Sequence, residues 1–222
     1  MKRIFISIIF VISLIITILF IDVQISTFDK EFYSNKFDEY NIQGITKIEK
    51  DTLMEVTDEL LKYMKGKRDD LIIRAEVNGK EEVVFEERER LHMVDVKDLF
   101  EKGFIIKNIA IIILIISLFF IIKFYPKILY KLLMISSIVP ILILGLFGIA
   151  ISINFNKYFT IFHEILFTND LWLLNPKTDI LIQMLPLDFF YSISMRILTY
   201  FILQLIILFL LGIGLREKHK ME

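Results

Sequence analysis

The sequence predicts a mainly α-helical, polytopic membrane protein: four transmembrane helices, a small α+β extracytoplasmic cap and an aromatic segment at the membrane interface. Two observations predict this class. The mean hydropathy of the 222 residues is +0.62, and 55% of them are hydrophobic. The apolar residues are concentrated in four uncharged runs. A soluble domain of this length rarely has so positive a mean hydropathy.

The four uncharged runs have the length of membrane helices. They are Ile4–Ile21, Asn108–Ile122, Leu132–Asn156 and Ile197–Leu215. About 17–25 apolar residues in a helix cross a hydrocarbon core of about 30 Å. A helix also satisfies its own backbone hydrogen bonds in lipid. We therefore expect transmembrane helices over residues 1–21, 104–122, 132–156 and 196–215.

The first run follows Met1, Lys2 and Arg3, as the apolar core of a signal peptide would. It is longer than such a core, and the following Asp22–Ile25 has no small-residue cleavage site. We expect the run to be retained as a membrane anchor.

The basic residues predict the orientation in the plasma membrane. Segments 1–3, 123–131 and 216–222 together hold eight basic and two acidic residues. Segment 22–103 holds 14 basic and 21 acidic residues, and segment 157–195 holds two and four. We therefore expect a cytoplasmic loop at 123–131 and a cytoplasmic tail at 216–222, with the N-terminus also in the cytoplasm. The cap at 22–103 and the segment at 157–195 then face outward.

Within the cap, apolar residues at helical spacing predict a helix over Thr46–Met64, with Thr46 and Glu49 as a capping box. The segments Leu71–Val77 and Glu81–Phe85 predict a hairpin with a type I′ turn at Asn78-Gly79. Residues 86–101 contain no helix breaker and predict a helix that leads into the second membrane helix.

Segment 157–195 and its flank are rich in aromatic residues, such as Tyr158, Phe162, Trp172 and Phe189. Aromatic rings favour the headgroup level of a bilayer, and the prolines at 176 and 186 divide the segment into short pieces. We expect an interfacial segment in which Asp179 caps a short helix. A site built here would take its substrate from the outer leaflet.

Two of the three histidines, His92 and His163, lie outside the predicted cytoplasmic tail, which holds His219. Arg88, His92 and Asp95 share one face of a helix, so Asp95 could orient the His92 imidazole. Desolvation would keep His163 neutral among its apolar neighbours, as a general base near pH 7 requires. Topology allows the two histidines to meet at one interfacial site. Each could instead be a structural histidine.

Several other chemistries are excluded or disfavoured. The chain has no cysteine, so it has no thiol nucleophile, disulfide or Cys-ligated zinc. A net charge of −1 argues against nucleic acid as a partner. We expect no metal and no cofactor. A transporter is disfavoured because the predicted spans contain no buried acid or base. Two alternatives stay open: a non-catalytic membrane receptor or scaffold, and an interfacial metal-dependent hydrolase.

Two blocks of sequence resemble a known family. Glu89–Lys97, which reads ERLHMVDVK, resembles a conserved block of lipoprotein intramolecular transacylases, four-helix membrane proteins of Gram-positive bacteria. The second block follows the same order as in that family. It comprises Phe159–Phe167, Asn169–Trp172, Asn175–Asp179, Leu181-Ile182 and Leu185-Pro186.

The resemblance implies an acyltransferase that acts on diacylated bacterial lipoproteins at the surface of membrane lipid. An acyl chain moves from the sn-2 ester of the diacylglyceryl group to the α-amine of the same N-terminal cysteine, which gives the lyso-form lipoprotein. The resemblance also implies that His92 and His163 are catalytic. No covalent acyl-enzyme is needed, because one substrate carries both reacting groups.

We assign the base role to His163. We assign the role of acid or oxyanion stabiliser to His92, which we expect Asp95 to orient and which we expect to charge more readily than His163. These two roles could be exchanged. Arg88, Asn169 and Trp172 are expected to bind the polar head of the substrate.

Overall fold

The computed structural model describes residues 1–77 and 79–221, with the side chains of 145–152 and 219–221 outside that description. The chain divides into two units. Unit 1 comprises Met1–Gln24, Gly103–Asn154 and Met195–Glu222, and unit 2 comprises Ile25–Lys102 and Phe155–Ser194.

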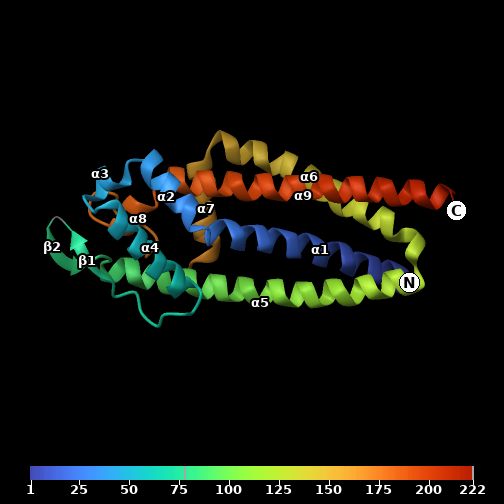
Figure 1. Cartoon of the computed structure of the whole chain (residues 1–222), viewed down its shortest axis with the longest axis horizontal. Coiled ribbons are helices and arrows are strands. Elements are labelled where there is room, and N and C mark those ends of the chain that lie inside the picture. The colour runs from blue at the N-terminus through green and yellow to red at the C-terminus, as the bar shows by residue number, and fades with distance from the viewer. Residues whose placement is uncertain (78, 222) are drawn as a thin grey trace. The chain divides into compact units, whose positions relative to one another are not determined.

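Unit 1 is built from four long helices (Figure 1). They are α1 (Lys2–Thr27), α5 (Glu87–Phe124, with its first turns in unit 2), α6 (Leu129–Ile153) and α9 (Leu187–Met221). A short 3-10 turn, η1 (Pro126–Ile128), joins α5 to α6. All four helices are long and apolar enough to cross a membrane, which confirms the predicted fold class. Their outer faces are apolar and exposed, for example at Ile115 and Leu142, as lipid-facing residues are.

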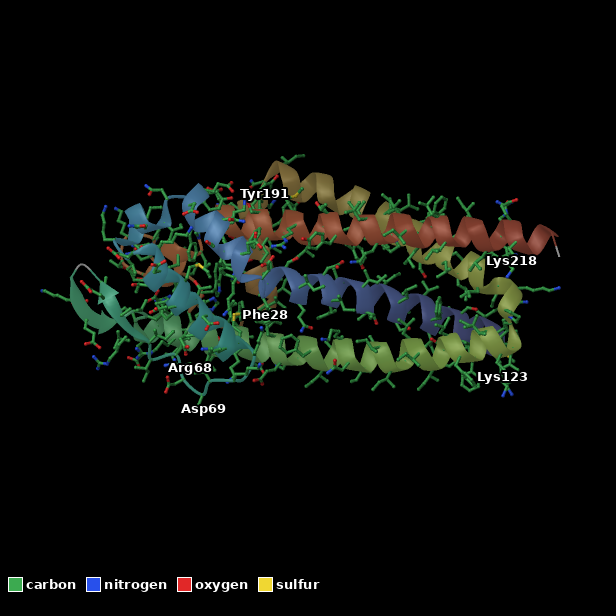
Figure 2. All side chains as sticks on the ribbon, viewed as in Figure 1. Phe28, Arg68, Asp69, Lys123, Tyr191 and Lys218 are labelled. Atoms are coloured by element: carbon green, nitrogen blue, oxygen red, sulfur yellow. The ribbon has the colours of Figure 1, made fainter. Side chains whose placement is uncertain are left out.

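Apolar contacts hold the helices of unit 1 together. Phe10 of α1, Ile121 of α5 and Leu132 of α6 form a buried cluster. Helix α9 approaches α6 closely at Gly212, where an added Cβ would lie 2.7 Å from Cγ of Met134. Small residues allow such close approach of helices in membrane proteins. At one end of the helices lie Lys123 and Lys218, two of the residues predicted to face the cytoplasm (Figure 2).

Two polar pairs link helices within unit 1. Gln204 of α9 donates from Nε2 to Oδ1 of Asp22 on α1 at 2.6 Å, and Lys107 of α5 donates to Gln24 of α1. Asp22 is fully buried, and it lies within α1, which continues beyond the apolar run to Thr27. The expectation of helices without a buried acid, which had disfavoured a transporter, is therefore wrong at this position.

We expect Gln204→Leu to lower the melting temperature of the detergent-solubilised protein, by a destabilisation of about 1–2 kcal/mol. The substitution leaves the buried carboxyl group of Asp22 without its donor. The double variant Asp22→Leu/Gln204→Leu removes both polar groups and should recover most of that loss. Asp22→Asn keeps an acceptor for Gln204 and serves as the control. Equal melting temperatures for Gln204→Leu and the wild type would show that the pair contributes nothing.

Unit 2 is a small α+β cap. Its elements are α2 (Lys30–Glu39), α3 (Ile42–Thr46), α4 (Lys50–Met64), β1 (Arg74–Val77), β2 (Lys80–Val83), the first turns of α5, α7 (Phe155–Leu166), α8 (Ile180–Met184) and the first turns of α9. The strands pair antiparallel, with Arg74 opposite Val83. A core of fully buried side chains includes Ile42, Leu53, Phe85 and Phe189.

The predicted hairpin and helices are present in the cap, but several of their ends differ. The strands β1 and β2 cover Arg74–Val77 and Lys80–Val83 in place of the predicted 71–77 and 81–85. Helix α4 begins at Lys50 with Glu49 in the N-cap position, so Thr46 and Glu49 do not form a capping box. Thr46 instead ends α3, where its hydroxyl donates to the carbonyl of Ile42. The predicted type I′ turn includes Asn78, which lies outside the described residues; Gly79 has φ of 77°, in the left-handed region that favours glycine. The predicted helix before the second span is continuous with it in α5.

Candidate active site

The structure brings His92 and His163 together within unit 2. His92 lies in the second turn of α5 and His163 near the end of α7. Their ring centroids are 6.2 Å apart, and each residue is only 8% exposed. Two imidazoles at this separation can act on the same reacting group. The predicted meeting of the two histidines is therefore present in the fold.

The ring of His163 is held in one tautomer. Its Nδ1 lies 2.7 Å from the carbonyl oxygen of Phe159, one turn earlier in α7. A carbonyl oxygen only accepts hydrogen bonds, so Nδ1 carries the proton, and Nε2 of the neutral ring keeps its lone pair. Burial lowers the pKa of His163, and the bond to Phe159 opposes this effect. The neutral ring with a free Nε2 is the form that a general base needs.

An aromatic enclosure surrounds His163. The ring centroids of Phe159, Trp172 and Phe167 lie 4.3, 5.0 and 5.6 Å from that of the imidazole. Phe159 lies one helical turn before His163, and the backbone N–H of Phe167 donates to the carbonyl of His163, so both rings are held next to the imidazole. Such an enclosure limits the water around the imidazole.

His92 is the less readily charged of the pair. Burial, followed by the nearby His163, lowers the pKa of His92 to about 4, against a smaller opposing effect from the charge of Asp95. Its Nδ1 is buried without a hydrogen-bond partner among residues 1–77 and 79–221. The expectation that His92 charges more readily than His163 is therefore wrong, because the deeper desolvation outweighs the neighbouring carboxylate.

The carboxylate of Asp95 is directed to a loop rather than to the imidazole of His92. Its Oδ2 accepts from Nδ2 of Asn169 at 2.9 Å. Arg88, on the same helix, donates to the carbonyl oxygen of Asp170. Two side chains predicted to bind substrate, Arg88 and Asn169, thus have partners within the protein. Trp172, the third, faces His163.

Comparison with known proteins decides the family. A family model described as lipoprotein intramolecular transacylase Lit matches residues 8–190. The chain belongs to the lipoprotein intramolecular transacylase family. The resemblance of the two sequence blocks is thereby confirmed, and so is the prediction of an acyltransferase in place of a receptor or scaffold.

Solved structures agree with this assignment. The lipoprotein intramolecular transacylase Lit from Bacillus cereus is 27% identical, covers 98% of this chain and 97% of its own, and has a TM-score of 0.79. Two variants of that protein, in which a histidine is replaced by alanine or by arginine, both have TM-scores of 0.80 at 26% and 27% identity. They cover 98% of this chain and 95% and 93% of their own. No curated protein sequence matches the chain.

The transacylase has one buried acid near the histidines that sequence reasoning missed. Glu89, one helical turn before His92, is fully buried. Its Oε2 accepts from the backbone N–H of Glu86 and its Oε1 from that of Leu181 in α8, both at 2.6 Å. Burial raises the pKa of Glu89 to about 7. Glu89 is the first residue of the block that resembles the family, whereas Glu87 lies outside it. The burial of Glu89 could not be predicted from that block, because it depends on α8, about 90 residues later in the chain.

The short helix of the second block begins as predicted. Asp179 occupies the N-cap position of α8, although its side chain accepts from the backbone N–H of Asn175 rather than from the helix. Helix α8 in turn packs on α3. The second sequence block thus connects the candidate active site, through α8, to the rest of the cap.

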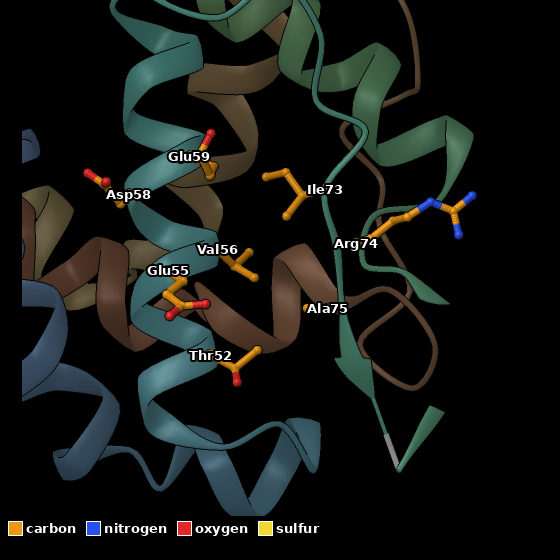
Figure 3. A pocket seen from close by; sticks show the side chains of 8 residues that line it. All are labelled: Thr52, Glu55, Val56, Asp58, Glu59, Ile73, Arg74 and Ala75. Carbon is orange, nitrogen blue, oxygen red and sulfur yellow. The ribbon is translucent and has the colours of Figure 1, made fainter. Parts of the chain in front are cut away.

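Within the described residues, the histidine pair is not part of a metal site and does not line the hollow on the cap. The described part of the transacylase contains no group of three His, Cys, Asp or Glu residues able to hold a metal ion. A hollow of about 250 Å³ lies between α4 and the stretch from Ile73 into the start of β1, with Val56 directed toward Ile73 (Figure 3). Neither histidine lines this hollow.

Proposed function

We propose that this transacylase moves the sn-2 acyl chain of a diacylglyceryl-cysteine to the α-amine of the same cysteine, with His163 as general base and His92 as a neutral hydrogen-bond donor. The observation that carries this proposal is the pairing of His92 with His163, whose tautomer is fixed by Phe159. Both rings are neutral at pH 7 because burial lowers their pKa values. The substrate class follows from the family.

The α-ammonium group loses two protons during the reaction. The first is lost when the ammonium becomes a nucleophilic amine. The amine nitrogen then forms a bond to the sn-2 ester carbonyl carbon, and the carbonyl oxygen becomes an oxyanion. The second proton leaves the nitrogen as the bond to the sn-2 oxygen breaks, and it ends on that oxygen. One proton is released to solvent, and the products are an amide and a free sn-2 hydroxyl.

Nε2 of His163 is suited to carry the second proton. It accepts the proton from the attacking nitrogen and returns it to the departing alkoxide, as a base that becomes an acid does. During this transfer the ring is an imidazolium, and the carbonyl of Phe159 and the faces of Trp172 and Phe167 lie against it. Aromatic faces attract a cation, which favours the transient charge.

His92 is suited to stabilise the oxyanion. Its buried Nδ1 has no acceptor to which it could donate within the described chain. The tautomer with the proton on Nε2 therefore avoids a buried N–H group without a partner. A neutral imidazole N–H can donate to an oxyanion without first taking up a proton.

The transfer is direct in this proposal. A chain without cysteine has no thiol for an acyl-enzyme, and a substrate that carries both amine and ester supplies its own effective molarity. We also propose that both termini are cytoplasmic and that the site acts at the outer leaflet. Supporting this, basic residues such as Lys123 and Lys218 lie at one end of unit 1, while His92 precedes the apolar part of α5.

Expression in a bacterial host that lacks lyso-form lipoproteins tests the proposal. We expect the N-terminal cysteine of a reporter lipoprotein to carry an N-acyl group and a monoacylglyceryl group, as resolved by tandem mass spectrometry. A reporter whose sn-2 chain is isotopically labelled should carry the label on nitrogen. Label that is diluted by bulk lipid would indicate an external acyl donor and would contradict intramolecular transfer.

A further inference from the structure

The loop after α7, defined here as residues 167–174, is tied to α5 at two adjacent residues. Asn169 donates from Nδ2 to Oδ2 of Asp95 at 2.9 Å, and Asp170 accepts from Arg88 through its carbonyl oxygen. Arg88 and Asp95 are seven residues apart in α5, so they lie on one face of the helix. The loop is therefore held along the face of the helix that carries His92.

Both polar atoms of the Asn169 carboxamide form hydrogen bonds. Oδ1 accepts from the backbone N–H of Leu171 at 3.0 Å, which closes an Asx turn, while Nδ2 donates to Asp95. The Asx turn requires an acceptor and the tie requires a donor. Aspartate at this position could form the turn but could not donate to Asp95. Asparagine at position 169 can therefore form both hydrogen bonds, whereas aspartate can form only the one that closes the turn.

The only tryptophan in the chain lies close to the tie. Trp172 follows Asn169 by three residues, and its ring lies 5.0 Å from that of His163 at an interplanar angle of 32°. Leu173, the next residue, is exposed, so the loop gains little from burial at that point. Asn169 and Asp170 make the polar contacts between the loop and α5, and the ring of Phe167 adds an apolar contact with His92.

We propose that Asp95 and Asn169, with Arg88, form a clasp of positioning residues that places Trp172 against His163. In this assignment Asp95 acts on His163 through the loop, in place of orienting His92, and Arg88 and Asn169 hold the loop in place of binding the substrate. The catalytic consequence rests on the proposed function of His163. The placement of Trp172 does not.

The exchange of amide and carboxylate tests the clasp. Asn169→Asp keeps the Asx turn but sets a carboxylate against Asp95, so we expect the emission of Trp172 to shift to the red and acrylamide to quench it more strongly. Asp95→Asn keeps an acceptor for Asn169 and should retain the wild-type spectrum. The double variant Asp95→Asn/Asn169→Asp restores one hydrogen bond with reversed polarity, and its spectrum should return toward that of the wild type.

Asn175→Asp is the matched control, because Asn175 closes a similar Asx turn with Lys177 and the substitution adds the same charge nearby. It should leave the emission unchanged. We expect the transacylation rate to fall on the order of tenfold in Asn169→Asp, as small misplacements at a catalytic group do, and to recover in the double variant.

A wild-type spectrum for Asn169→Asp, or a double variant no better than Asn169→Asp, would overturn the clasp. The spectra also separate this proposal from the proposed function. Were the histidines not catalytic, the emission changes would still occur while His163→Ala remained active. Were the clasp absent, His163→Ala would be inactive while the emission of Asn169→Asp stayed unchanged.

Discussion

Replacement of His163 by alanine should lower the rate of lyso-lipoprotein formation by about 10²–10⁴-fold, the usual contribution of a general base. The hydrogen bond from Nδ1 of His163 to the carbonyl of Phe159 leaves the lone pair of Nε2 free. Glutamine is similar in size but has no basic nitrogen, so His163→Gln should be equally impaired. Single-turnover conversion of a reporter lipoprotein, followed by mass spectrometry, measures the rate. Unfolding temperatures in detergent show whether each variant is folded.

The pH dependence of the wild-type rate belongs to the same prediction. Burial lowers the pKa of His163 below its ordinary value of 6.5, so the ring loses its base function only when the pH falls through that lowered pKa. The limb that belongs to His163 should therefore lie below pH 6.5, apart from the limb that deprotonation of the substrate's α-ammonium group adds at about pH 7.7–8.0. His219→Ala, in the C-terminal tail, is the histidine control and should keep both rate and profile. An active His163→Gln variant would rule out the base role.

Replacement of His92 by alanine should lower the rate by about 10²–10³-fold, the effect of losing one oxyanion donor. Asparagine supplies a neutral N–H donor, so His92→Asn should recover part of this loss. The recovery depends on the neutral state of His92, which follows from its pKa of about 4. The rates of the two variants are compared across pH 5–9 with the reporter used for His163.

The His92→Asn profile distinguishes a donor from an acid. A neutral donor does not titrate in this range, so the variant should keep the acid limb that belongs to His163. Were His92 a general acid, asparagine would be no better than alanine, and the wild-type profile would show a basic limb that both variants lose. That result would exchange the two roles and contradict the assignment made here.

The local sequence pattern was sufficient for the helices of unit 1, because each apolar run must satisfy its backbone hydrogen bonds in lipid by forming a helix. The same reasoning failed at Asp22, where α1 continues past the apolar run into a polar contact with Gln204. It also failed at Thr46, which fits a helix start by pattern but ends α3. Asp22 is held by a residue 182 positions away, whereas Thr46 is held by the local bond to Ile42.

The candidate site also contains some residues that could be identified from the sequence and others that could not. His92 and His163 could be selected from the sequence because few residue types act as a base near neutral pH, and the chain has only three histidines. The partner of Asp95 could not be selected, since Asn169 is separated from it by 74 residues. Nor could the burial of Glu89, which depends on the backbone of Leu181.

The sequence by itself determined the class of this protein, its two candidate catalytic histidines and its family, because hydropathy, residue chemistry and local motifs are properties of short segments. The tertiary structure alone decided the state of those histidines. A pKa and a tautomer depend on the groups packed around a ring, and here these are the carbonyl of Phe159, the ring of Trp172 and the loop held by Asp95. Burial and hydrogen-bond partners arise only when distant segments pack together.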